Sequence, residues 1–444
     1  MEESNTVTLQ DLNNTFDELS KLFKSSDNSW RLAQSLDTIL DYFTVNPSQA
    51  KGFIPIILDR YHNYYIDPHA DNLASPDDCP SCQASYPTTA QSPWWYDDYN
   101  WWTIAMNKAS RMPDTFGADY TPIFAGISRF CWDTVFRNGT QVWDNCNTLY
   151  GDYFSRFEPR FNGGIWNYGY SKYPIKFMPD TPLDPNPDLD QALGINPSVG
   201  GLPDRLRGIQ NTVTNGLNLI ASARMAAAVK PENLNISTTA KDQLDFLLNW
   251  FEVEDSSGQP LSLYCRFPVT DSGLVRERVS SYMKPEYPVH GYDSNLIWLG
   301  DQGLILGGFA EMLNTLPPSS DNYAKCMAYI EGIIKGVNYN LANDGQYYPW
   351  FNLNSPSAPG PSPGGDDDDY LTGVGIYFRY LLNLYENYPA IKAFMEQEEI
   401  PQAALVNISN HYCDVANFDG DGAHFTVLTN KLAVQLAAYK MNQG

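Results

Sequence analysis

Two adjacent carboxylates, Asp97 and Asp98, stand within the aromatic stretch SPWWYDDYNWW at residues 92–102. Two like charges at one site resist ionising together, so one member of such a pair keeps its proton while the other is anionic. A protonated carboxyl beside a carboxylate provides a general acid and a nucleophile, the two groups that cleave a glycosidic bond. The pair is therefore the first candidate for chemistry.

The residues around the pair predict that both acids begin a helix. Residues four apart share a helix face, which aligns Asp97 with Trp101 and Asp98 with Trp102. In a first turn, both carboxyls can lean toward one mouth, close to the separation of about 5–5.5 Å found in retaining glycosidases. Two other interpretations stay open: aspartate is a common N-cap residue, and aromatic rings at helical spacing often fill a core.

Composition restricts the partners. The 444 residues include 28 Lys plus Arg and 52 Asp plus Glu, a formal charge of -24, which repels phosphate backbones and anionic membranes. Nucleic acid is therefore a disfavoured partner, whereas neutral sugars can stack on the aromatic residues that make up 14% of the chain. The sequence contains no run of about 18 apolar residues that would predict a transmembrane segment.

Helical periodicity dominates the chain. Apolar residues recur at three- and four-residue spacing in about twelve segments, one of them at 401–416, whereas strand-like alternation is confined to short pieces such as 261–269. We find no βαβ alternation, which predicts one all-α domain over residues 1–444. Stretches rich in Pro, Gly and Ser predict loops at 67–93, 151–207 and 354–370, and the aromatic content of the second favours a functional role.

The stretch WWYDDYNWWTIAMNKA resembles glycoside hydrolase family 76, the endo-α-1,6-mannanases and their fungal cell-wall relatives, which carry an Asp-Asp pair before a Trp-rich helix. Further stretches follow in the order of that family: GGIWN at 163–167, QNTVTNGLNLIASARMA at 210–226, DQGLILGGFAEM at 301–312 and GVGIYFRYLLNL at 373–384. The resemblance covers about residues 90–385. DQG stands where the family more often has Asn-Gln-Gly, and about forty residues replace a short link after GGIW.

The resemblance implies an (α/α)6 barrel, a retaining mechanism and a mannan-type polysaccharide or glycan as substrate. It assigns Asp97 as the nucleophile and Asp98 as the general acid/base, and this chemistry requires no cofactor and no metal. We also expect aromatic walls and polar groups that bind the sugar. These substrate-binding candidates are Trp94, Trp95, Trp101, Trp102, Trp166, Asn167, Asn211, Asp301 and Gln302.

Two other functions stay open. The same barrel could serve as a non-hydrolytic glycan-binding or cell-wall protein, or as an isomerase or lyase that would rely on His, Tyr or Arg. The histidines show no metal-ligand spacing. The acidic runs at 366–369 and 414–425 lack the closing Glu of a calcium loop, so we expect solvated loops there.

The compartment is a separate question. The first residues, MEESNTVTLQ, lack the features of a signal peptide. Sequons at Asn13, Asn138, Asn235 and Asn407, together with seven cysteines, favour a secreted or cell-surface glycoprotein with disulfides whose leader has been removed. An intracellular location is the alternative, and the sequence leaves the oligomeric state and the disulfide pairing open.

Overall fold

The computed structural model describes residues 6–26, 28–64, 96–136, 164–165, 211–228, 234–252, 263–277, 296–343, 345–353 and 367–443. Four predicted substrate-binding residues lie outside the described residues, namely Trp94, Trp95, Trp166 and Asn167. The predicted loops at 67–93 and 151–207 also lie outside them, apart from residues 164–165.

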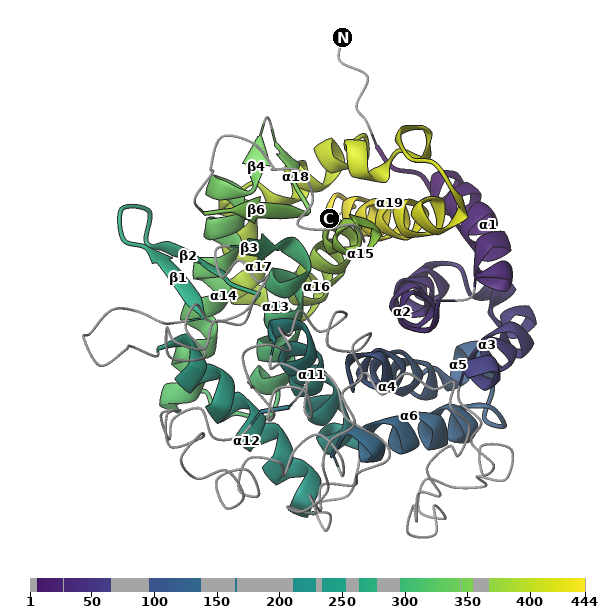
Figure 1. The fold of residues 1–444 in the computed structure, drawn as a ribbon, viewed down its shortest axis with the longest axis horizontal. Helices are drawn as coiled ribbons and strands as arrows, with labels where there is room; N and C mark the ends of the chain where they lie inside the picture. Colours follow the sequence, from purple (N-terminus) through teal and green to yellow (C-terminus); the bar gives the residue numbers. More distant parts are fainter. Residues whose placement is uncertain are drawn as a thin grey trace, which may run out of the picture.

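Six helices among the described residues form a closed inner ring (Figure 1). They are α2 (Ser29–Val45), α4 (Tyr96–Ser110), α11 (Thr212–Ala228), α13 (Leu299–Leu313), α16 (Gly373–Asn387) and α19 (Asp421–Met441). Each packs against the next in chain order, and α19 closes the ring against α2. Because an inner helix is covered on every side, it needs apolar residues all round and not only along one stripe.

An outer layer surrounds this ring. It comprises α1 (Leu9–Ser25), α3 (Ala50–Tyr64), α6 (Thr121–Val135), α12 (Leu234–Phe251), α14 (Asp321–Asn340), α17 (Pro389–Gln397) and α18 (Ile400–Asn407), with the short α5 (Pro113–Phe116) against α3. The outer helices are one-sided: α1 buries Leu12, Phe16, Leu19 and Phe23 on one face. Inner and outer helices alternate along the chain, which is the (α/α)6 barrel expected from the sequence, and that prediction is confirmed.

Short strands and turns connect the helices. Strand β1 (Tyr264–Phe267) pairs antiparallel with β2 (Ser272–Val275), β3 (Leu296–Trp298) with β6 (Trp350–Asn352), and β4 (Ala342–Asn343) with β5 (Gln346–Tyr347). The strand expected within 261–269 is therefore β1. The helix expected over 401–416 ends at Asn407, and the chain continues through the 3-10 turns η7 (His411–Cys413) and η8 (Val415–Asn417). A further 3-10 turn, η1 (Pro47–Gln49), precedes α3.

Glycine allows two inner helices to cross closely. A Cβ atom on Gly303 of α13 would lie 2.8 Å from the Cα of Tyr377 on α16, closer than any real Cβ contact. Only a residue without a side chain fits there. The glycines of the DQGLILGG stretch therefore serve helix packing.

A buried ion cluster crosses the interior of the ring. Asp37 on α2 accepts from Lys108 on α4 at 2.8 Å, and its second carboxylate oxygen lies 3.2 Å from the Nε of Arg379 on α16. Arg224 on α11 lies 3.9 Å from Asp37 and pairs with Glu311 on α13 at 2.7 Å. Burial alone would raise the pKa of Asp37, but Lys108, Arg379 and Arg224 outweigh it and hold that pKa well below its ordinary value. The cluster thus links α2, α4, α11, α13 and α16.

The expected disulfides and glycans find no support in the described residues. Cys265, Cys326 and Cys413 are free thiols. The sequon asparagine Asn407 is 0% exposed, and its amide donates to the carbonyls of Gly345 at 2.7 Å and Ala403 at 2.8 Å. This burial and these hydrogen bonds do not support a glycan at Asn407. No helix in the described part of the chain is both long and apolar enough to span a membrane.

Removing the acid at the centre of the cluster should strongly destabilise the barrel. Asp37→Ala removes the carboxylate partner of the buried Arg379, whereas Lys108 keeps Asp41 and Arg224 keeps Glu311. Because Arg379 loses its counter-charge in the interior, we expect the free energy of unfolding to fall by about 3–5 kcal/mol. Asp59→Ala is the matched control, because Asp59 pairs with Arg60 at the surface and should contribute about 0–1 kcal/mol. Urea unfolding at neutral pH measures both, and equal small losses would contradict the structural role of the cluster.

Candidate active site

The inner helices begin at one end of the barrel. At the start of α2, the hydroxyl of Ser29 accepts a 3.1 Å hydrogen bond from the indole nitrogen of Trp102 on α4. Before α16, the carbonyl of Tyr370 accepts a 2.9 Å bond from the indole of Trp298, the residue that precedes α13. Phe418, just before α19, packs with Tyr370 against the pair formed by Trp350 and Leu371. The positive ends of these helix dipoles therefore lie at the same end of the barrel, which we call the mouth.

Glu277 joins α11 to this mouth. Its carboxylate accepts a 3.0 Å hydrogen bond from the hydroxyl of Tyr370, and its carbonyl accepts a 2.9 Å bond from the backbone N–H of Thr212 at the start of α11. Glu277 itself is buried. The loop after β2 thus fixes where α11 begins relative to α16.

Asp97 and Asp98 occupy the first turn of α4, as the spacing predicted. Asp98 is 7% exposed and Asp97 is partly buried. The backbone N–H of Asp98 donates to Oδ1 of Asp97 at 3.2 Å, which orients that carboxylate and favours its charged form. The helix N-terminus also favours negative charge at both positions.

The surroundings raise the pKa of both acids. Burial is the main cause for Asp97 and raises its pKa to about 7; local backbone hydrogen bonds oppose the rise and the charge of Asp369 adds to it. Burial also leads for Asp98, and the charges of Asp97 and Asp369 raise its pKa further, well above the ordinary value. Asp97 accepts the backbone hydrogen bond and is the more exposed, so it ionises first and leaves the proton on Asp98.

Asp369 is a site residue that the sequence interpretation missed. It belongs to α15 (Asp367–Leu371), which begins inside the segment 354–370 that was predicted to be a loop. Its Oδ1 lies 2.7 Å from Nη2 of Arg31 on α2, a residue 338 positions away in the chain. Periodicity carries no information about a contact at that separation. The one available signal was that Asp369 comes shortly before the apolar stretch of α16, much as Asp97 and Asp98 come shortly before the apolar stretch of α4.

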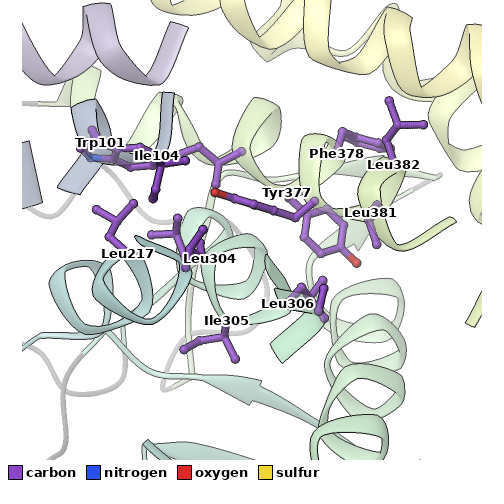
Figure 2. Close-up of a cluster of buried hydrophobic side chains, with 14 of the residues drawn as sticks. Trp101, Ile104, Leu217, Leu304, Ile305, Leu306, Tyr377, Phe378, Leu381 and Leu382 are labelled. Carbon is purple, nitrogen blue, oxygen red and sulfur yellow. The ribbon is translucent and has the colours of Figure 1, made fainter. Parts of the chain in front are cut away.

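The two tryptophans predicted as sugar walls are buried. Trp101 is 2% exposed, stacks on Trp30 with ring centroids 6.4 Å apart, and lies in the apolar cluster with Ile104 and Leu217 that Figure 2 shows. Trp102 is 0% exposed, donates to Ser29 and meets the ring of Tyr61 edge-on. These contacts favour the core-filling interpretation that the sequence left open.

Of the predicted polar contacts, two are engaged with the backbone. Asn211 accepts from the N–H of Thr214 at 3.1 Å and so caps the start of α11. Gln302 accepts from the N–H of Val275 at 2.8 Å and donates to its carbonyl at 2.7 Å, which fastens β2 to α13. Asp301 is fully buried in the first turn of α13, at the same end of the barrel as Asp97 and Asp98. Asn211 and Gln302 therefore position elements of the mouth.

A second aromatic group lies at this end, outside the Trp-rich stretch. The ring of Trp350 on β6 lies 6.4 Å from Tyr370 and 6.0 Å from Tyr412, and Trp298 lies 6.1 Å from Tyr370. Tyr370 and Tyr412 are only partly buried. Because these residues come from separate short elements, their sequence pattern did not reveal them as a group.

Solved structures share this barrel, whereas no family model and no curated protein sequence matches the chain. A family 76 α-1,6-mannanase from Salegentibacter sp. HEL1_6 superposes with a TM-score of 0.57 at 12% identity, over 97% of this chain and 100% of that chain. Dfg5 from Chaetomium thermophilum, solved with glucosamine, gives 0.55 at 13% identity, over 98% and 91%. This chain shares its barrel fold with these family 76 structures.

One further match is a variant of the Salegentibacter mannanase. It is inactive, carries asparagine in place of two consecutive aspartates, and was solved in complex with α-1,6-mannotriose. It superposes with a TM-score of 0.56 at 12% identity, over 97% of this chain and 100% of that chain.

Within this barrel, we expect Trp102 to contribute to stability. Trp102→Ala removes a buried indole and its hydrogen bond to Ser29, so we expect the free energy of unfolding to fall by about 3–5 kcal/mol. Trp30→Ala, at a partly exposed ring, is the control and should have a smaller effect. Denaturant unfolding of both variants measures the two losses. An unchanged stability of Trp102→Ala would contradict the core-filling role and favour a sugar-binding role for Trp102.

The raised pKa values predict how the stability depends on pH. A carboxyl with a higher pKa in the folded state than its ordinary 3.8 binds its proton more tightly when folded. Its contribution is fully present below that ordinary value and is lost as pH rises through about 7, the pKa of Asp97. In Asp98→Asn, a neutral amide replaces one of the two carboxyls. The free energy of unfolding of this variant should therefore decline less between about pH 4 and pH 8 than that of wild type.

The control for this pH series is Asp59→Asn, which changes a surface carboxyl. Unfolding by urea across the pH range measures each slope. The control should keep the wild-type slope. An Asp98→Asn slope identical to wild type would contradict the buried, protonated state of Asp98.

Proposed function

We propose that the protein is a retaining glycoside hydrolase, or a transglycosidase, that acts on α-1,6-linked mannose-type glycans. Asp97 is the nucleophile and Asp98 the general acid/base, and residues 1–444 form one catalytic domain. The observation that carries this proposal is the pair of consecutive carboxylates in the first turn of α4, which ionise in order at the mouth of the barrel.

The chemistry follows from that order of ionisation. Asp98 donates its proton to the glycosidic oxygen, the bond from that oxygen to the anomeric carbon breaks, and the Asp97 carboxylate bonds to the same carbon. Asp98, now anionic, then takes a proton from water, whose oxygen displaces Asp97 and restores both acids. A sugar hydroxyl in place of water would give transfer. Neither step requires a group beyond the two carboxyls and the acceptor.

The solved relatives support the choice of substrate. The inactive variant of the Salegentibacter mannanase lacks two consecutive aspartates and is bound to α-1,6-mannotriose. Asp97 and Asp98 are the consecutive pair of this chain at the start of an inner helix in the same fold. We extend the substrate class to this chain on that basis. A polysaccharide substrate also fits a secreted or cell-surface protein, a location that belongs to this proposal.

Activity on α-1,6-mannan tests the function directly. Wild type should release reducing ends, and Asp97→Asn and Asp98→Asn should each lower kcat by about 10²–10⁴-fold. On aryl mannosides with acidic leaving groups, Asp98→Ala should recover part of the rate, because departure of such a group needs little protonation. Asp97→Ala should not recover. The surface change Asp59→Asn should leave the rate unchanged.

Two results would contradict the assignment. Rescue of Asp97→Ala in place of Asp98→Ala would exchange the two roles. A folded wild type that cleaves and transfers none of these substrates but binds mannooligosaccharides in calorimetry would favour the non-hydrolytic glycan-binding protein.

A further inference from the structure

We propose that Arg31 and Asp369 are positioning residues with opposite charges that together set the pH at which Asp98, the general acid, loses its proton. This inference rests on the proposed function of that pair and adds a residue from α2 and one from α15. Neither residue belongs to the chemistry described above. Both act through the charge they present to the two carboxyls.

Packing between α2 and α4 fixes where Arg31 stands. The ring of Trp30 stacks on Trp101, which lies one turn after Asp97. Ser29 accepts the indole hydrogen bond of Trp102, which lies one turn after Asp98. Two consecutive residues at the start of α2 are therefore held against the turn that follows the two acids, and Arg31 is the next residue.

Arg31 is held in place by the ring of Trp30 and forms an ion pair with Asp369. Its guanidinium lies 5.6 Å from the centre of the Trp30 ring and 2.7 Å from Oδ1 of Asp369. The side chain of Arg31 is 12% exposed and that of Asp369 is 49% exposed. A cation at the start of α2 and an anion on α15 thus meet at the end of the barrel where α4 begins.

Charged side chains lie on each of the elements that pack against α4 and α15. They are Arg31, Asp37 and Asp41 on α2, Arg129 and Asp133 on α6, Arg224 on α11, Arg379 and Glu386 on α16, and Asp421, His424, Lys431 and Lys440 on α19, with Glu277 held by Tyr370 and Asp301 buried in the first turn of α13. Asp369 on α15 differs from these described groups, because its charge raises the pKa of both Asp97 and Asp98. Arg31 offsets part of that charge at contact distance.

The two partners should therefore have opposite effects on the acids. Without Asp369, a negative charge is removed and the positive charge of Arg31 is no longer offset by it, which favours ionisation of the carboxyls. Without Arg31, the charge of Asp369 is no longer offset and disfavours ionisation. A salt bridge that served only to hold α2 against α15 would instead give the same change whichever partner was removed. The half-exposed Asp369 keeps either shift moderate, because water and salt screen it.

The test compares three variants of the full chain. Asp369→Asn should move the alkaline limb of the kcat/KM profile on α-1,6-mannan to lower pH by about 0.5–1 unit, and Arg31→Met should move it to higher pH by a similar amount. Arg31→Lys retains the charge and should stay near wild type. Aspartate labelled with carbon-13 at the carboxyl gives a second readout by NMR titration that needs no turnover. The resonances are assigned with Asp97→Asn and Asp98→Asn.

The readouts separate the possible failures. Opposite shifts of the carboxyl resonances in Asp369→Asn and Arg31→Met support the inference, even if wild type shows no glycosidase activity, in which case the proposed function alone fails. Shifts in the same direction, or none in either variant, overturn it even if the enzyme is active. If Arg31→Met does not fold, the sign in Asp369→Asn decides, and an upward or absent shift overturns the inference.

Discussion

The attraction between Asp37 and the cations Lys108, Arg379 and Arg224 holds the inner ring together at its centre. Five of the described inner helices contribute to this cluster, once Glu311 is included. Ridges and grooves alone leave neighbouring helices some freedom to slide. A buried charge with several partners restricts that freedom, because leaving any partner unpaired in the interior is costly. Because the starts of these helices form the mouth of the barrel, the cluster also fixes the geometry of the mouth.

Helix α4 carries two opposite electrostatic environments. Its first turn holds Asp97 and Asp98, whose pKa values are raised, and its last turn holds Lys108, ten residues after Asp98 and about 15 Å along the axis. Lys108 helps to lower the pKa of Asp37. Both arrangements agree in sign with the helix dipole, with acids at the start and a cation at the end. They differ in what determines the pKa: burial raises the pKa of Asp97 and Asp98, whereas three neighbouring cations together outweigh burial and lower the pKa of Asp37.

The sequence predicted the fold and the location of the acid pair, but not the surroundings of that pair. Periodicity identified the helices, and the start of α4 at Tyr96 follows from the spacing around Asp97. It could not separate a wall from a core at Trp101, since an inner helix is apolar on every face. Asn211 and Gln302 were predicted as sugar contacts because they are polar, yet each satisfies backbone groups that a buried helix or strand end leaves open. Arg31 and Asp369 are 338 positions apart in the sequence, so their contact depends on the closed ring and could not be predicted from local spacing.

The two sets of carboxyls also have opposite consequences for stability. Asp37, with its lowered pKa, contributes stability above its ordinary pKa and loses it as pH falls. Asp97 and Asp98 stabilise the folded state when protonated and weaken it as pH rises toward and beyond about 7. At the pH where one acid of the pair is ionised for chemistry, the fold therefore relies on the Asp37 cluster. Because Asp37 lies on α2 and Lys108 on α4, the cluster directly joins the helix that carries the acid pair to the helix that packs against its first turns.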